Sequence, residues 1–189
     1  MNSETDQAIG GMDIELLKCV DGVFVKQVRI VRSDPKDGWA WLRLAGLALR
    51  TGPKSETVDA FESVVSEVGD SYLGWFLLGK LEDRLGFWRK AESAYRRAIR
   101  LERTDAALWT SLGGVFRSEG RYHAAERALL RAVELNPEYS QAWLDLASVY
   151  SELGDSVQCR AALEKAYDSD SLSVAEYVRA LERSARAIR

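Results

Sequence analysis

Large apolar residues recur along the chain with a period of 34 residues. Three residues after each tryptophan of this series comes a leucine, and a small residue follows the leucine directly. Spacings of three and four place side chains on one face of a helix. Each unit is therefore predicted to open with an amphipathic helix. The columns are Trp41, Trp75, Trp109 and Trp143; Leu44, Leu78, Leu112 and Leu146; and Ala45, Gly79, Gly113 and Ala147, with Tyr177 continuing the first column.

A second set of columns predicts a second helix in every unit. Sixteen residues after each tryptophan stands a mostly small residue, and twenty residues after it stands a large apolar one. A glycine lies between the two sets, where the first helix has to end and the chain has to reverse, because glycine adopts positive φ at little cost. These columns are Thr57, Ala91, Ala125 and Cys159; Phe61, Tyr95, Leu129 and Leu163; and, for the glycines, Gly52, Gly86, Gly120 and Gly154.

The third unit shows the pattern most completely. Its residues Trp109-x2-Leu112-Gly113-x2-Phe116, continued by Ala125-x3-Leu129, Ala132 and Pro137, resemble the tetratricopeptide repeat. The resemblance implies an all-α fold, a right-handed α-solenoid of stacked antiparallel helix pairs with about nine to eleven helices. We expect four repeats, at 38–71, 72–105, 106–139 and 140–171. Glu82 departs from the pattern, because it stands where the repeat carries an aromatic residue late in its first helix.

The two ends of the chain do not repeat fully. Residues 1–11 are polar and end in Gly10-Gly11, so we expect them to be disordered. Residues 12–37 are expected to form an N-terminal capping helix or degenerate repeat, with a helix over Met12–Arg32. Residues 172–189 are expected to form a C-terminal capping helix on which Tyr177 faces the fourth repeat. The alternative is that a further repeat follows.

The inventory of reactive side chains argues against catalysis. The chain has one histidine, His123, expected at the surface, and two cysteines, Cys19 and Cys159, that form no metal-binding or redox pair. No phosphate-binding glycine loop occurs. We therefore expect no catalytic residues, no metal and no cofactor, and the protein is not expected to be an enzyme.

Charge and hydropathy narrow the class of partner. The net charge of −3 makes nucleic acid an improbable partner for the chain as a whole. No stretch approaches the length of about 20 apolar residues that spans a membrane. The start of the chain carries no secretory signal, so a cytoplasmic location is expected.

The resemblance implies that the first helices line a concave groove, which would bind a protein or peptide partner. Large apolar groups and a few cations are expected to face it, and such exposed apolar groups usually mark a binding surface. The predicted partner-binding residues are Trp39, Leu42, Leu49, Leu73, Phe76, Lys80, Arg84, Thr110, Arg117, Gln141 and Leu144.

The sequence leaves three alternatives open. In the first, residues 1–37 fold over these apolar groups and bury them. In the second, the basic stripe at 84–103, which contains seven Arg or Lys and two Glu, binds RNA. In the third, the array associates with itself through its end faces and forms a homo-oligomeric scaffold. As a large core truncation, Trp109→Ala is expected to lower the free energy of unfolding by roughly 3–5 kcal/mol.

Overall fold

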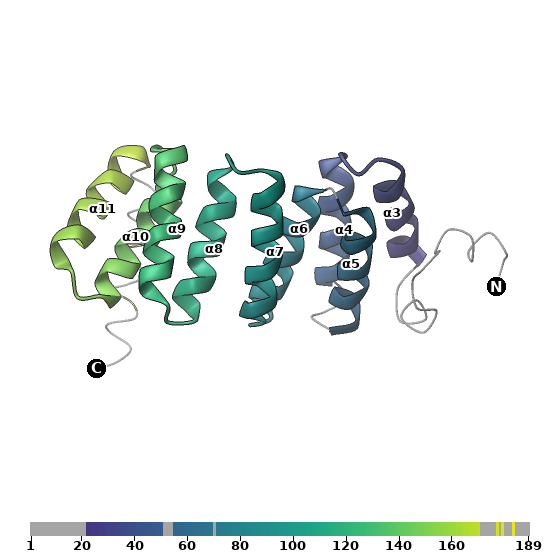
Figure 1. Cartoon of the computed structure of the whole chain (residues 1–189), viewed down its shortest axis with the longest axis horizontal. Coiled ribbons are helices and arrows are strands. Elements are labelled where there is room, and N and C mark those ends of the chain that lie inside the picture. Colours follow the sequence, from purple (N-terminus) through teal and green to yellow (C-terminus); the bar gives the residue numbers. More distant parts are fainter. Residues whose placement is uncertain are drawn as a thin grey trace. The chain divides into compact units, whose positions relative to one another are not determined.

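The computed structural model describes residues 22–50, 55–69 and 71–170, together with the single positions 177, 179 and 183. Within this part of the chain every regular element is an α-helix (Figure 1). The chain divides into two compact units, Met1–Leu101 and Glu102–Arg189. The predicted disorder of residues 1–11 and the first half of the helix predicted at Met12–Arg32 lie outside the described residues.

The first unit contains α3 (Gly22–Ser33), α4 (Gly38–Arg50), α5 (Ser55–Val68), α6 (Tyr72–Arg84) and α7 (Trp88–Leu101). Helices α4 and α5 form one pair and α6 and α7 form the next, and both α4 and α5 pack against α6. Helix α3 packs against α4 through Phe24, Val28 and Val31, which are buried as their spacing predicts. Arg32 at the end of α3 forms an ion pair with Glu67 of α5.

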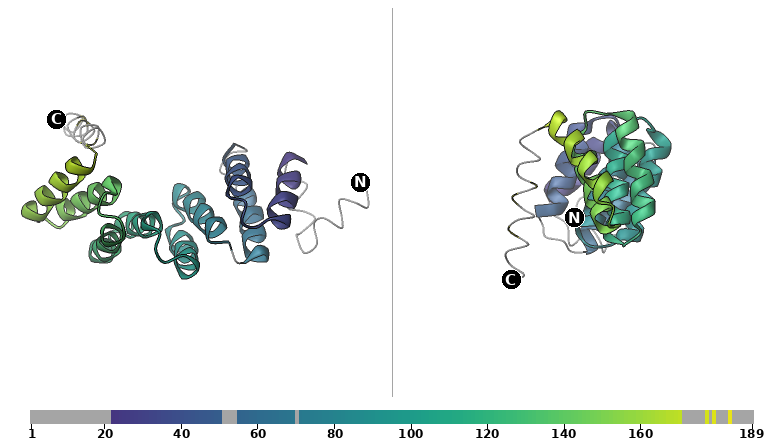
Figure 2. Two further views of the ribbon diagram at one scale, coloured as in Figure 1. Left: turned by 90° about the horizontal axis from the view of Figure 1, so that it is seen from above. Right: turned by 90° about the vertical axis from the view of Figure 1, so that its left-hand side faces the viewer.

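The second unit contains α8 (Ala106–Ser118), α9 (Tyr122–Leu135), α10 (Ser140–Glu152) and α11 (Ser156–Ser169). The two helices of each pair pack against one another, as the left view of Figure 2 shows, and α10 packs against both α8 and α9. Across both units, the first helices begin at Gly38, Tyr72, Ala106 and Ser140, which repeats the interval of the tryptophans. The expected all-α solenoid of stacked helix pairs is confirmed.

The turn inside each of the last three pairs is closed by the predicted glycine, whereas Gly52 of the first pair lies outside the described residues. Gly86, Gly120 and Gly154 have φ of 76°, 72° and 75°. In the turn after α6, the amide of Gly86 donates to Asp83 and the amide of Phe87 donates to Glu82. The same two bonds recur after α8 and α10. This paired pattern satisfies the last carbonyl groups of the first helix and lets the chain reverse in three residues.

The paired columns bring the two helices of a repeat close together. A β-carbon added at Gly79 would lie 2.6 Å from the ring of Tyr95, and one added at Gly113 would lie 2.6 Å from Leu129. Both large side chains are fully buried. The glycine of the first helix therefore leaves the space that the large residue of the second helix fills.

The four tryptophans of the series share one hydrogen bond. Each indole Nε1–H donates to the backbone carbonyl oxygen six residues earlier in the chain, at distances between 2.7 and 3.1 Å. The acceptors lie in the segment that precedes each first helix, and they are again 34 residues apart. They are Pro35, Gly69, Arg103 and Pro137. Each indole is thus hydrogen-bonded to the loop that precedes its own helix.

Burial of these four indoles is unequal, and this corrects one expectation. Trp41 is 0% exposed and Trp75 is 6% exposed. Trp109 and Trp143 are only partly buried. The shared hydrogen bond depends on the local backbone alone, whereas full burial also depends on the neighbouring helices. The expected cost of roughly 3–5 kcal/mol therefore applies to Trp41 more directly than to Trp109.

Trp41→Ala is expected to lower the free energy of unfolding by roughly 3–5 kcal/mol, because it empties a fully buried site and removes one hydrogen bond. Trp109→Ala should cost less. The matched control is Trp39→Ala on the same helix, since Trp39 is 76% exposed and should change stability by less than about 0.5 kcal/mol. Urea denaturation followed by circular dichroism measures all three. Equal effects at Trp41 and Trp39 would show that the indole of Trp41 is not in the core.

Candidate functional site

The first helix of the first pair, α4, exposes two large apolar side chains. Trp39 is 76% exposed and Leu42 is 48% exposed. They are three residues apart and so lie on one face of the helix. Neither belongs to the columns that pack the repeat. Asp37 accepts hydrogen bonds from the amides of Trp39 and Ala40, which fixes the start of α4 and with it the position of the indole.

Helix α6 extends this surface. A β-carbon added at Gly38, next to Trp39, would lie 3.1 Å from Cδ2 of Leu73. Leu73 therefore lies beside the start of α4 and is partly buried there. We call Trp39, Leu42 and Leu73 the α4–α6 face.

Three more of the predicted lining residues follow along α6. Phe76 is partly buried against Tyr95, with 6.0 Å between the ring centroids, and Nζ of Lys80 lies 5.2 Å from the centroid of its ring. Lys80 and Arg84 are exposed. Phe76 thus lies beneath a cation and is less accessible than predicted.

In the second unit, the structure contradicts two of the predicted lining residues. Thr110 and Leu144 are each 5% exposed. The Thr110 hydroxyl donates to the carbonyl of Ala106, and Leu144 forms a cluster with Ala166, against which Trp143, Leu163 and Tyr177 pack. The column one residue after each tryptophan therefore differs between the units, because Leu42 is exposed whereas Thr110 and Leu144 are buried.

The other predicted residues are placed as follows. Arg117 on α8 and Gln141 on α10 are exposed, and the Gln141 amide donates to Asp145 at 3.2 Å. Tyr177 packs on the fourth repeat as expected, and its hydroxyl lies 2.7 Å from that of Ser148. The side chain of Leu49 lies outside the described residues.

A buried carboxyl group lies within the first unit. Glu82 of α6 is 1% exposed, and its Oε2 has no hydrogen-bond partner among the described residues. Burial, with a smaller contribution from the carboxylates of Glu62 and Asp59 and against the opposing effect of Lys90, raises the pKa of Glu82 to about 7. At neutral pH about half of the Glu82 carboxyl groups are therefore protonated, whereas an ordinary glutamate is almost fully ionised.

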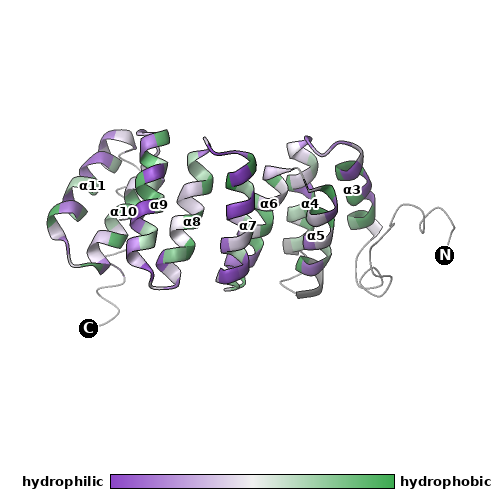
Figure 3. Cartoon of the chain, viewed as in Figure 1, coloured by the Kyte–Doolittle hydropathy of each residue, from purple (hydrophilic) through white to green (hydrophobic). Residues whose placement is uncertain are grey.

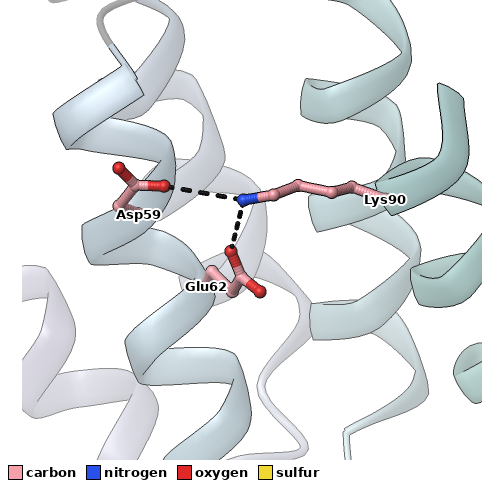
Figure 4. A network of polar contacts seen from close by, with 3 residues as sticks. All are labelled: Asp59, Glu62 and Lys90. Atoms are coloured by element: carbon pink, nitrogen blue, oxygen red, sulfur yellow. Dashed lines mark hydrogen bonds and ion pairs between the residues drawn. The ribbon is translucent and has the colours of Figure 1, made fainter. Parts of the chain in front are cut away.

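The three charged groups that act on Glu82 form a network between α5 and α7 (Figure 4). Nζ of Lys90 lies 3.3 Å from Glu62 and 3.8 Å from Asp59. The hydrogen bond to Glu62 raises the pKa of Lys90. Lys90 thus forms ion pairs between α7 and α5, the second helices of two successive repeats.

The pKa of Glu82 predicts that stability falls as pH rises. Below about pH 4.5 the carboxyl group is protonated in both the folded and the unfolded chain. Between about pH 4.5 and 7 the unfolded chain releases the proton first, and above pH 7 the full cost applies, which is roughly 3 kcal/mol. Glu82→Gln should remove most of this dependence. Urea denaturation between these pH values measures it, with Glu164→Gln, an exposed carboxylate, as the control. A wild-type slope that survives in Glu82→Gln would contradict the assignment.

Sequence reasoning missed a second exposed apolar group. Phe87 and Trp88, in the turn after α6 and at the start of α7, are 46% and 40% exposed. They follow Gly86 directly and stand outside all the packing columns. The sequence could have indicated their exposure, because this position is more polar in the next two repeats, which carry Arg121-Tyr122 and Asp155-Ser156.

The remaining chemistry in the described part of the chain is sparse. No group of three or more His, Cys, Asp and Glu side chains is placed to hold a metal ion among the described residues. The side chain of His123 is 77% exposed and lies 3.5 Å from Glu126, so its predicted surface position is confirmed. No described helix has both the length and the apolar character required to cross a membrane.

Helix pairs that recur at a fixed interval, each with the same indole hydrogen bond and three of them with a glycine turn in the described residues, define an all-α repeat protein of the solenoid class. Two family models described as tetratricopeptide repeat match residues 76–122 and 116–183 and together span more than half of the sequence. The chain belongs to the tetratricopeptide repeat family.

Solved structures show the same fold. A crystal structure of MamA has 21% sequence identity and a TM-score of 0.66, with 86% of this chain and 97% of that chain covered. YrrB, described as a TPR protein with an unusual peptide-binding site, has 17% identity and a TM-score of 0.65, with 87% and 84% covered. No curated protein matches the sequence.

Proposed function

We propose that the chain is a protein-interaction scaffold and that the α4–α6 face binds a peptide or helix of a partner protein. The exposure of Trp39 carries this proposal. Folding leaves about three quarters of its surface in water, beside the half-exposed Leu42. Tryptophan is the residue type most enriched among side chains that dominate binding energy, because it buries a large area with few rotatable bonds.

The charges near this face favour one kind of ligand. Lys80 and Arg84 are exposed farther along α6, so cations lie at one end of the apolar group. A segment with one large apolar anchor followed by acidic residues would place the anchor on Trp39 and Leu42 and its carboxylates near Lys80 and Arg84. The peptide-binding site described for YrrB supports peptide binding by analogy of fold alone.

The N-terminal segment is a competing occupant of this surface. Its described part, α3, packs against α4 and leaves Trp39 and Leu42 exposed. The rest of the segment, residues 1–21, lies outside the described residues. The proposal therefore rests on the face as α3 leaves it.

The double variant Trp39→Ala/Leu42→Ala tests the proposal. A peptide selected from a displayed random library against the full chain should bind the variant at least about 30-fold more weakly, because two central apolar contacts are lost. Isothermal titration calorimetry measures the affinity.

Leu130→Ala/Val157→Ala is the matched control, since these side chains are 38% and 76% exposed on α9 and α11. The control should bind as the wild type does. Selected peptides that bind the Trp39/Leu42 variant with unchanged affinity would overturn the proposal, provided that circular dichroism shows both variants folded.

A further inference from the structure

Helix α7 is unlike the other described helices in its charge. It carries five basic residues and a single acidic one, in a chain whose net charge is −3. One side of the helix is buried through Ala91, Ala94, Tyr95, Ala98 and Ile99. Figure 3 shows hydrophilic residues over much of the rest of α7. The cations are therefore gathered on the outward side of one helix.

Three of the five basic residues form a line along that side. Arg89, Arg96 and Arg100 are exposed, and Ser93 lies between the first two. Arg89, Arg96 and Arg100 stand at positions i, i+7 and i+11, with Ser93 at i+4, so they fall within a narrow angle around the helix and extend over about 16 Å along its axis. We call Arg89, Arg96 and Arg100 the α7 stripe.

The other two basic residues of α7 have partners elsewhere. Lys90 binds Asp59 and Glu62 of α5, and the guanidinium group of Arg97 lies 4.4 Å from the ring centroid of Trp75. Both therefore contribute to the packing of the first unit. Arg96 forms an ion pair at 2.7 Å with Glu92, whose side chain is 10% exposed, so the guanidinium group is anchored from below while it stays 56% exposed. Anchoring of this kind lowers the entropy that a long side chain loses on binding.

We infer that the α7 stripe, with Trp88 at its start, is a second docking surface, separate from the α4–α6 face, and that it binds a short acidic segment of a partner protein. Guanidinium groups bind carboxylates through paired hydrogen bonds, and Trp88, which is 40% exposed and precedes Arg89 directly, offers an apolar contact beside the stripe. An acidic helix whose glutamates recur at i, i+4, i+7 and i+11 carries three of them at the spacing of the three arginines.

The surroundings of the stripe favour a short acidic segment over a long polyanion. The neighbouring helix α5 carries the exposed carboxylates Asp59, Glu62 and Glu67. A nucleic acid strand or an anionic membrane presents negative charge over a much greater length than about 16 Å, so most of its charge would lie beyond the stripe, in a chain whose net charge is −3. A segment the length of the stripe is matched by it.

The experiment uses the full chain and a synthetic fluorescein-labelled helical peptide with glutamates at i, i+4, i+7 and i+11 and one leucine at its end. Fluorescence anisotropy is expected to show binding that weakens between about 50 and 200 mM salt. The same peptide with glutamines in place of the glutamates should not bind.

Arg89→Glu/Arg96→Glu/Arg100→Glu is expected to weaken binding at least about tenfold, because attraction at three sites becomes repulsion. Replacing the same three residues with glutamine should give a smaller loss, and this milder variant decides the matter if the first does not fold. The control Arg127→Glu/Arg160→Glu/Lys165→Glu reverses three exposed charges on α9 and α11 and should change affinity by less than about twofold.

Two probes separate the classes of partner. Labelled oligouridylate and vesicles of phosphatidylcholine with phosphatidylserine should bind more weakly than the acidic peptide. The inference is overturned if the peptide does not bind, if the control variant loses affinity equally, or if either probe binds through the stripe more tightly than the peptide does.

Discussion

The bond from each indole N–H to the carbonyl oxygen six residues earlier is the interaction on which the repeat depends. It connects the first turn of a first helix to the loop that leads into it, and so fixes the angle at which the chain enters every pair. A buried indole N–H without a partner would be costly, and the loop carbonyl has no partner within a helix. One side chain therefore satisfies two polar groups and at the same time fills the space between helices.

Much of the fold could be predicted from the sequence because the indole bond and the packing columns act within a single repeat. Columns such as Gly79 with Tyr95, and glycines such as Gly86, act within one repeat, so their spacing alone indicates their role. Full burial depends on which helix stacks next. For that reason the exposed positions of Leu42 and Lys80 could be predicted, whereas the burial of Thr110 and Leu144 could not. The exposure of Phe87 and Trp88 was not predicted, although both residues stand outside the packing columns.

Residues that depart from the columns distinguish this chain from the general pattern of the repeat. Glu82 replaces an aromatic residue at a buried position and leaves a carboxyl group beside Lys90, Glu62 and Asp59. Trp39 stands two residues before the structural Trp41 and contributes no packing of comparable extent. A repeat tolerates such departures because each pair is stabilised mainly by its own columns and its nearest neighbours.

The indole bonds are tested most directly by hydrogen exchange of the six indole N–H groups, observed by NMR in protein labelled with nitrogen-15 tryptophan. Trp41 and Trp75, which are bonded and buried, should exchange most slowly, and Trp109 and Trp143 at intermediate rates. Trp39 and Trp88, which are exposed, should exchange at the rate of free indole. Exchange of Trp41 and Trp75 as fast as that of Trp39 would contradict the view that these bonds hold the repeats together.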